Sequence, residues 1–292
     1  MTRHRTSTRR LNAAETQQHI EAMAIEAPGV SALAHRDPPG NVIYDWHSHR
    51  RHQLLYAISG ILRVETHDSE LIVSPQRALW IPANVAHRTR LENVSSASVF
   101  ISVRQYRDRG RRVRVLAAPP LMREMIVHAL RWGPSAGTDT RTREQFFRTL
   151  CILLKEWMQG ELPCALPRTD HPALSRSLRY AHANLETVSL VDAARAGAVS
   201  VRTLRRLITA ELRTTWREYL NQTRMNRAMV LLCEPSQRVA RVAEMTGFGS
   251  VSAFSARFRQ FAGEAPREYR CRASAGRQTT LQNITTAPPA RF

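Results

Sequence analysis

The chain has 292 residues, which is enough for two domains. Its 43 lysines and arginines outnumber 24 acidic residues and give a formal net charge of +19, nearly all from arginine because Lys155 is the only lysine. This charge favours a polyanionic partner such as nucleic acid. No apolar run reaches the roughly 18 residues of a membrane-spanning helix, and none follows the basic start, so we expect neither membrane binding nor a signal peptide. The four cysteines form no close pair, which is typical of reduced thiols in a cytoplasmic protein.

Residues 1–30 are mostly polar and basic, and we expect a flexible arm with at most a short helix near residues 13–24. The character of the sequence changes at about residue 31. Short runs of β-branched and aromatic residues then alternate with turn residues such as Ser59-Gly60, up to about residue 112. Many short strands at this spacing predict a small β-barrel or sandwich over residues 31–112.

The strand region contains three histidines and a glutamine with the spacing of a metal site. His47 and His49 would share one face of a strand, and Gln53 and the more distant His87 could join them. Three imidazoles can hold a divalent cation such as zinc, but the neutral amide of Gln53 is a poorer ligand than a carboxylate. The alternative is that these polar side chains line a pocket for an organic effector, and the residues alone leave both hypotheses open.

Aromatic residues of the same region are candidates for the wall of a ligand pocket. Trp46, Tyr56, Trp80 and Phe100 could line the mouth of a barrel, where ligand sites commonly lie. The alternative for each is a place in the core. His52 stands beside the histidine pattern but outside it, and we expect it at the surface.

Residues 113–167 are expected to be mainly helical. An apolar stripe around Met125 and another around Leu150 are separated by a Gly/Ser/Thr-rich break. Such a helical pair could form a homodimer or cover the barrel, and the sequence does not distinguish the two. A proline-containing linker then leads into a helical domain over residues 168–271, and residues 272–292 lack apolar periodicity and predict a flexible tail.

The helical domain contains an internal repeat with an offset of 50 residues. The stretch Ala193–Leu204 aligns with Ala243–Phe254 at its alanine, glycine, serine-valine and apolar positions. Each copy predicts a helix, a turn and a second helix, over about residues 188–209 and 238–259. Gly197 and Gly247 would end the first helices with a positive φ, and a serine three residues later would cap the next helix. Such paired helices are typical of the helix-turn-helix, whose second helix enters the DNA major groove.

The polar faces of the second helices agree with DNA binding. Arginines early in the first unit can each bond two acceptors of guanine, whereas the second unit offers smaller polar groups. We therefore predict that the first unit carries more base specificity and that the second depends more on phosphate contacts and DNA shape. The predicted DNA-binding residues are Ser200, Arg202, Thr203, Arg205, Arg206, Ser250, Val251, Ser252, Ser255 and Arg257.

The residues between the two units predict a connecting helix. The segment 216–233 contains neither glycine nor proline, and a helix of this length spans about 25 Å. A strut of that length could hold two recognition helices about 34 Å apart, which is one turn of B-DNA. One chain would then read two successive major grooves.

Together these features resemble the DNA-binding domain of the AraC/XylS family of bacterial transcription regulators. The matching residues are Ala193, Gly197, Ser200, Leu204 and Arg206 in the first unit, Ala243, Gly247, Phe248, Ser250, Phe254, Phe258, Pro266, Tyr269 and Arg270 in the second, and Tyr219, Leu220, Arg224, Ala228, Leu231 and Leu232 between them. Three positions depart from the family pattern, with Ile208 in place of Phe, Arg213 in place of Gly, and Ala256 where an arginine often reaches DNA.

The strand region resembles the cupin barrel, whose metal ligands correspond to His47, His49 and His87, with Gln53 in place of the usual glutamate. The two resemblances imply an α+β chain, in which an N-terminal cupin-like barrel precedes an all-α domain with two helix-turn-helix units. They imply a ligand-responsive, sequence-specific transcriptional regulator rather than an enzyme. Its partners would be promoter DNA, a small-molecule or metal effector, RNA polymerase and a second copy of itself. The alternatives are a metal-sensing regulator, a cupin metalloenzyme fused to a DNA reader, and a constitutive DNA-binding protein whose barrel only dimerises.

Overall fold

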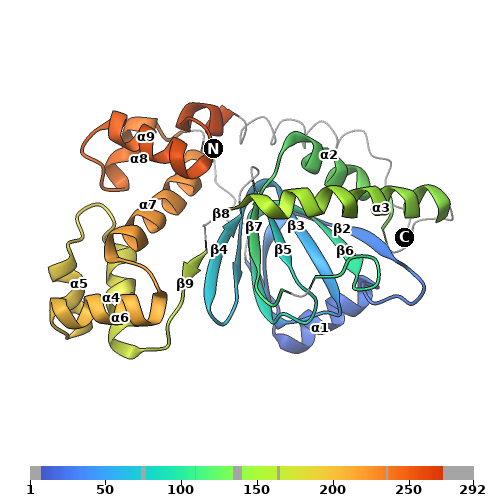
Figure 1. Cartoon of the computed structure of the whole chain (residues 1–292), viewed down its shortest axis with the longest axis horizontal. Helices are drawn as coiled ribbons and strands as arrows, with labels where there is room; N and C mark the ends of the chain where they lie inside the picture. The colour runs from blue at the N-terminus through green and yellow to red at the C-terminus, as the bar shows by residue number, and fades with distance from the viewer. Residues whose placement is uncertain are drawn as a thin grey trace. The chain divides into compact units, whose positions relative to one another are not determined.

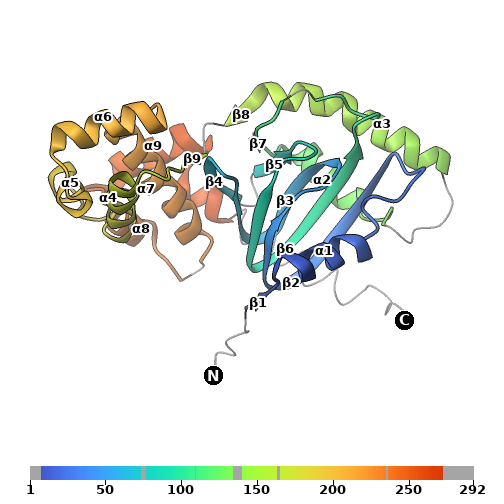
Figure 2. The same cartoon turned by 90° about the horizontal axis from the view of Figure 1, so that it is seen from below.

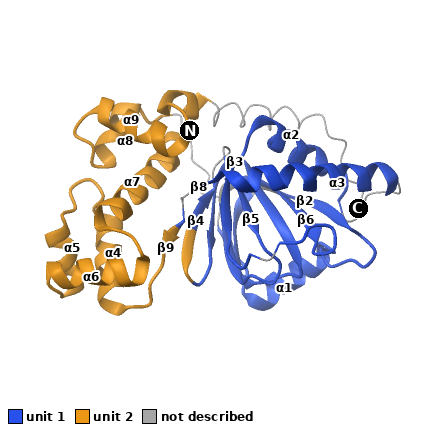
Figure 3. Ribbon diagram, in the orientation of Figure 1, with its two compact units in different colours: residues 1–67, 71–165, 275–292 blue, residues 68–70, 166–274 orange. Residues whose placement is uncertain are grey.

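The computed structural model describes residues 8–73, 77–108, 110–133, 140–162, 165–234 and 236–271. The chain divides into two compact units (Figure 3). The first contains a sheet and the second is helical apart from one short strand pair, so the α+β class is confirmed. Within the described ranges, no helix combines the length and the apolar character needed to cross a membrane.

The first unit is built on a strongly curved, mostly antiparallel sheet (Figures 1 and 2). Its long central strands pair with one another, and the shorter strands extend the sheet on either side. The strand order is β1 (Arg9–Arg10), β2 (Ala32–His47), β6 (His87–Ser102), β3 (Arg51–Glu65), β5 (Arg77–Ile81), β7 (Arg114–Ala117) and β8 (Glu161–Leu162), with β4 (Ser69–Val73) off this path beside β3. The sheet therefore extends past residue 112, into the region expected to be a helical connector.

The two faces of β3 have different partners because alternate residues of a strand point to opposite faces. Leu54 and Tyr56 lie in an apolar core with Trp80, and helices α2 (Pro120–Ala129) and α3 (Thr140–Trp157) pack on that core. Gln53 and Leu55 point to the other face, where they line a pocket. The short 3-10 helix Met158–Gly160 follows α3 and leads into β8.

The expectation of a flexible arm over residues 1–30 is wrong for its described part, which begins at residue 8. Helix α1 (Ala13–Ala22) is fixed by a capping box between Asn12 and Glu15. Ile20 and Ile25 then join an apolar cluster with Leu33 and Phe100 of the sheet. The capping pair and the buried isoleucines outweigh the polar composition of the segment.

The second unit contains the predicted repeat. Helix α6 (Val201–Leu212) and helix α9 (Val251–Ala262) have the same length and begin and end 50 residues apart. Each is preceded by a serine whose side chain accepts a bond from the backbone of the third helical residue. The other elements are β9 (Leu166–Pro167), which pairs with residues 69–70, α4 (Pro172–Ala183), α5 (Leu190–Gly197), α7 (Trp216–Leu232), α8 (Val239–Met245) and a helical segment over residues 266–271.

The role predicted for Gly197 is wrong, whereas that of Gly247 is confirmed. Gly247 has a φ of 74°, but in the first unit the left-handed residue is Ala198, with a φ of 56°. Gly197 is instead required by packing. A Cβ atom there would collide with Ser177 Oγ and lie 2.9 Å from the carbonyl oxygen of Ala173, both on α4. The close approach of α4 and α5 therefore needs a residue without a side chain.

We expect Gly197→Ala to lower the free energy of unfolding by about 1–3 kcal/mol, because it overpacks this contact. Gly249→Ala is the matched control, since a Cβ atom at Gly249 would meet nothing within 4 Å. Thermal denaturation of the full chain followed by circular dichroism measures both. Equal melting temperatures for the two variants would contradict the packing role.

Candidate DNA interface and effector pocket

Helix α6 separates a buried apolar side from an exposed basic side. Leu204 and Ile208 are fully buried, whereas Arg202, Arg205 and Arg206 are exposed. Within the described part of the chain, none of these three guanidinium groups forms an ion pair with a carboxylate. They are available for phosphate oxygens or base edges, and whether they contact DNA stays a prediction.

The two predicted serines at the start of the recognition helices have a structural role. Ser200 Oγ accepts a hydrogen bond from the backbone of Thr203 at 3.1 Å, and Ser250 Oγ accepts one from the backbone of Ala253 at 3.2 Å. Each hydroxyl satisfies a backbone N–H that has no partner inside the helix. They hold the helix ends that would enter a groove.

Helix α9 presents fewer free cations than α6. Val251 and Ser252 are exposed, but Ser255 and Arg257 are only half-exposed. Arg257 also donates to Gln260 Oε1 at 2.7 Å. Arg259, near the end of the helix, is also exposed. It is absent from the predicted DNA-binding residues, which were chosen from the earlier turns of the helix.

Helix α7 joins the two helix-turn-helix units through Arg224. Its Nε and Nη2 atoms donate to the carbonyl oxygen of Leu185 at 3.1 and 2.9 Å. Gly247 lies against the same guanidinium, because a Cβ atom on Gly247 would overlap with it and lie 2.7 Å from the carbonyl oxygen of Glu186. One side chain thus packs the α4–α5 turn against the turn of the second unit. Burial lowers the pKa of Arg224, which nevertheless stays charged at neutral pH.

The three departures from the family pattern have different consequences. Ile208 fills its core position and is fully buried. Arg213 adopts the left-handed conformation with a φ of 52°, where Gly263 of the second unit has a φ of 80°. The turn geometry is therefore kept, although a residue with a Cβ atom is strained there. Ala256 is exposed and offers no polar group.

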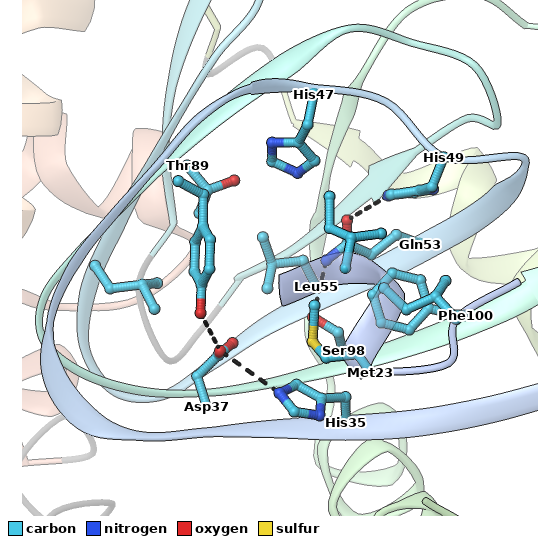
Figure 4. Close-up of a pocket in the computed structure, with 14 residues that line it drawn as sticks. Met23, His35, Asp37, His47, His49, Gln53, Leu55, Thr89, Ser98 and Phe100 are labelled. Carbon is cyan, nitrogen blue, oxygen red and sulfur yellow. Dashed lines mark hydrogen bonds and ion pairs between the residues drawn. The ribbon is translucent and has the colours of Figure 1, made fainter. Parts of the chain in front are cut away.

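The first unit contains a cavity on the face of the sheet opposite α2 and α3. Its volume is about 40 Å³, which is room for a few water molecules and far below the roughly 300 Å³ of a pocket for a drug-sized ligand. Figure 4 shows polar side chains on two sides of it, with His47, His49 and Gln53 on one side and His35 and Asp37 on the other. Apolar residues including Leu55 and Phe100 separate the two groups.

The structure brings the predicted metal-site residues together. His47 and His87 are direct cross-strand partners on β2 and β6, and their ring centroids lie 4.2 Å apart. The rings of His49 and His87 are 5.4 Å apart. His49 Nε2 lies 3.1 Å from Gln53 Oε1, and Gln53 Nε2 donates to Ser98 Oγ at 2.8 Å. Gln53 is thus already engaged by two neighbours.

Backbone carbonyls orient the histidine rings. His47 Nδ1 donates to the carbonyl oxygen of Asp45 at 2.7 Å, and His87 Nδ1 donates to that of Val85 at 2.9 Å. A neutral ring that donates from Nδ1 keeps a lone pair on Nε2. The Nε2 atom of His87 is buried without a hydrogen-bond partner in the described structure.

The histidines of this cluster are electrically neutral at physiological pH. Burial lowers the pKa of His47 to about 4. Burial also lowers the pKa of His49, and it lowers that of His87 well below its ordinary value with a further contribution from the two neighbouring histidines. Neutral imidazole nitrogens can accept a hydrogen bond or bind a metal.

Of the four aromatic residues predicted to line a pocket, Phe100 lines the cavity and the other three lie elsewhere. Tyr56 and Trp80 belong to the core beneath α2 and α3, and Trp46 stacks on His67 with a centroid distance of 4.8 Å. None of the three lines the cavity that contains the histidines. Tyr56 faces away from it because the neighbouring Leu55 faces toward it.

The expectation that His52 lies at the surface is wrong. Its ring is buried and stacks on Trp80. His52 Nδ1 accepts from the backbone of Ala83 at 3.0 Å, and Nε2 lies 3.0 Å from the carbonyl oxygen of Tyr106. His52 is a satisfied core residue.

Sequence reasoning missed the second polar group of the cavity. His35, Asp37 and Tyr44 of β2 line it, and His19 of α1 lies beside them. The alternation of His35 and Asp37 could have indicated a shared strand face. Tyr44 breaks that alternation because β2 shifts register twice between Asp37 and Val42.

Comparisons with known proteins agree with both halves of this architecture. A helix-turn-helix domain family matches residues 193–272, and a cupin domain family matches residues 34–103. The transcriptional regulator NimR of Escherichia coli is 28% identical over 248 residues, which is 84% of this chain and 87% of NimR. The crystal structure of an AraC-type transcriptional regulator from Chromobacterium violaceum is 33% identical, with a TM-score of 0.34, over 35% of this chain and 92% of that chain. This chain belongs to the AraC family of transcriptional regulators.

As an AraC-type regulator, the protein binds promoter DNA through its helix-turn-helix domain. Another similar structure is the DNA-binding domain of AdpA in complex with a target DNA, which is 26% identical with a TM-score of 0.34 and covers 36% of this chain and 96% of that chain. Similar proteins, NimR among them, carry the names of transcriptional regulators or activators rather than of enzymes.

We expect Arg206→Ala to weaken specific DNA binding by about 1–3 kcal/mol and to relax base preference at one position, because a bidentate arginine–guanine pair would be lost. Selection of bound sequences from a random DNA pool measures both effects. Arg148→Ala, at an exposed position of α3 in the first unit, is the control because it removes the same charge. A uniform loss of affinity for all sequences would make Arg206 a phosphate contact.

Proposed function

We propose that this AraC-type regulator is ligand-responsive and that one chain reads two successive major grooves. Helix α7 has 17 residues, which corresponds to about 25 Å. The capping box between Thr215 and Glu218 fixes its first turn, and Tyr219 packs in the core of the first helix-turn-helix unit. This short, packed connection supports reading of two grooves at fixed spacing by α6 and α9.

The cavity of the first unit is the proposed effector site. The observation that carries this proposal is the pair of imidazoles, His47 and His49, that line the cavity beside Gln53. The ring of His87 adjoins both of them, and its buried Nε2 atom has no described hydrogen-bond partner. Uncharged imidazole nitrogens at a cavity wall can accept hydrogen bonds from a ligand. The small volume favours a compact effector.

A metal at His47, His49, Gln53 and His87 is the second candidate. The neutral rings and their carbonyl-oriented Nδ1 atoms fit metal ligation, since metal-bound histidines are usually held through their other nitrogen. Against it, Gln53 is hydrogen-bonded on both sides. The only described group of three or more histidine, cysteine or acidic side chains with ligand atoms within 4.8 Å of one another is His19, His35 and Asp37. We therefore favour an effector that donates a hydrogen bond to an imidazole nitrogen such as Nε2 of His47.

The regulatory step we propose is a population shift. An effector changes activity only if it binds one arrangement of the chain more tightly than another. The helices α2 and α3 pack on the back of the strands that line the cavity, so they are the elements through which such a difference would pass. In this scheme the protein acts in the cytoplasm as a non-enzymatic regulator, with RNA polymerase as a further partner at the promoter.

We also propose that the protein forms a homodimer through its first unit. Three large apolar side chains on α2 and α3 are exposed there, with exposures of 55% for Leu121, 38% for Val127 and 57% for Ile152. Apolar surface of this kind is commonly covered by a partner. The flexible tail predicted at residues 272–292 lies outside the described residues, and this proposal does not depend on it.

We expect His47→Phe to abolish stabilisation by an effector, because it replaces an imidazole that lines the cavity by a ring without a hydrogen-bonding nitrogen. A thermal-shift screen of parent and variant against hydrogen-bonding small molecules and divalent metal salts measures this. Compounds that stabilise both proteins equally would place the effector site elsewhere.

Ile152→Glu should shift the protein from dimer to monomer, since it places a charge in the proposed apolar interface. Sedimentation velocity of the full chain measures the change, and Gln18→Glu at an exposed position of α1 controls for the single added charge. A parent protein that is monomeric at all concentrations tested would contradict the dimer.

A further inference from the structure

Two imidazoles and a carboxylate meet where α1 packs against β2, and two of these groups, His35 and Asp37, line the cavity. His19 from α1 and His35 and Asp37 from β2 each bring one ligand atom within 4.8 Å of the others. Asp37 and His35 appear together on one side of the cavity in Figure 4. These residues are separate from His47, His49, Gln53 and His87, which belong to the family's usual metal position.

The spacing of these atoms suits an ion between them. His35 Nε2 and Asp37 Oδ1 are 3.7 Å apart, which is beyond ordinary hydrogen-bond length. Two ligand atoms bound to one tetrahedral ion at bonds of about 2.1 Å lie about 3.4 Å apart. A shift of a few tenths of an ångström would therefore bring this pair to ligating distance.

Tyr44 completes the group and connects it to α1. Its hydroxyl donates to Asp37 Oδ1 at 2.8 Å and lies 3.2 Å from His19 Nε2. Ser96 Oγ donates to the other carboxylate oxygen at 2.7 Å. Carboxylates that bind metals are commonly oriented by such neighbouring donors.

The charge of the group favours a cation. The Asp37 side chain is only 13% exposed. Burial raises its pKa, but the neighbouring His35 and the hydrogen bonds from Ser96 and Tyr44 outweigh burial, so the pKa is lowered and the carboxylate is ionised. Burial lowers the pKa of His19. A buried carboxylate beside imidazole nitrogens matches the donor set of divalent transition metals.

The size of the cavity beside His35 and Asp37 also suits a metal ion. About 40 Å³ accommodates an ion with one or two water molecules. Three protein ligands would leave a coordination position open toward the cavity.

We propose that His19, His35 and Asp37 bind a divalent transition-metal ion such as Zn²⁺ or Co²⁺, with Tyr44 orienting the carboxylate. The bound ion would tie α1 to β2. This inference does not depend on the sensor role proposed above, because it concerns metal binding by the protein without DNA or effector.

Titration of the EDTA-treated full chain with Co²⁺, followed by visible absorption and competed with Zn²⁺, tests this site. We expect one equivalent to bind to the parent. His19→Ala and Asp37→Asn should each weaken binding by at least about tenfold, since they remove a direct ligand. Asn keeps hydrogen-bonding partners for Tyr44 and Ser96, and circular dichroism checks that both variants fold. His87→Phe is the control and should bind Co²⁺ as the parent does.

Limited proteolysis gives a second readout. Because the ion would join α1 to the sheet, Zn²⁺ should slow cleavage within residues 8–31 of the parent and of His87→Phe, but not of His19→Ala. No Co²⁺ binding to the parent, or unchanged binding to His19→Ala, would overturn the proposal. Loss of binding in His87→Phe would also overturn it, because the ion would then belong to the His47–His87 cluster.

Discussion

The geometry of the DNA-reading half depends on the contact between Arg224 and the two turns that meet it. The guanidinium donates to the Leu185 carbonyl oxygen, and the absence of a side chain on Gly247 lets the second turn lie against it. A planar cation with several donors suits this position, because it can bond one turn and pack against another. This contact joins the two helix-turn-helix units, as the proposed reading of two grooves by one chain requires.

The cupin-like half is organised by the two faces of one sheet. The face beneath α2 and α3 is apolar and holds the unit together, which leaves the opposite face free to carry polar groups. Helix α1 covers part of that second face through Ile20 and Ile25. The result is a small cavity whose imidazole of His47 and carboxylate of Asp37 are held by a backbone carbonyl and by neighbouring hydroxyls.

The periodicity of the sequence predicted the repeated helical elements, whereas the roles of several other residues depend on tertiary packing. The 50-residue offset, the serine caps and the exposed arginines of α6 followed from the sequence, because each depends on local chemistry. The role of Gly197 did not follow from the sequence, since it depends on the close approach of α4. Tyr56 and Trp80 were assigned to the pocket because the alternation of residues in a strand does not show which face of the sheet is covered by helices. The pairing of α1 with His35 and Asp37 depends on tertiary contacts and register shifts that no short sequence pattern carries.

The central claim is that α7 holds two recognition helices at a fixed spacing on one face of DNA. Its most direct test is the affinity of the protein for its selected DNA site, compared with the same site lengthened by five base pairs between the two half-sites. Half a helical turn places the second groove on the opposite side of the duplex. We predict a loss of affinity to the level of a single half-site. Unchanged affinity for the lengthened site would mean that the two units read DNA independently and would contradict the account.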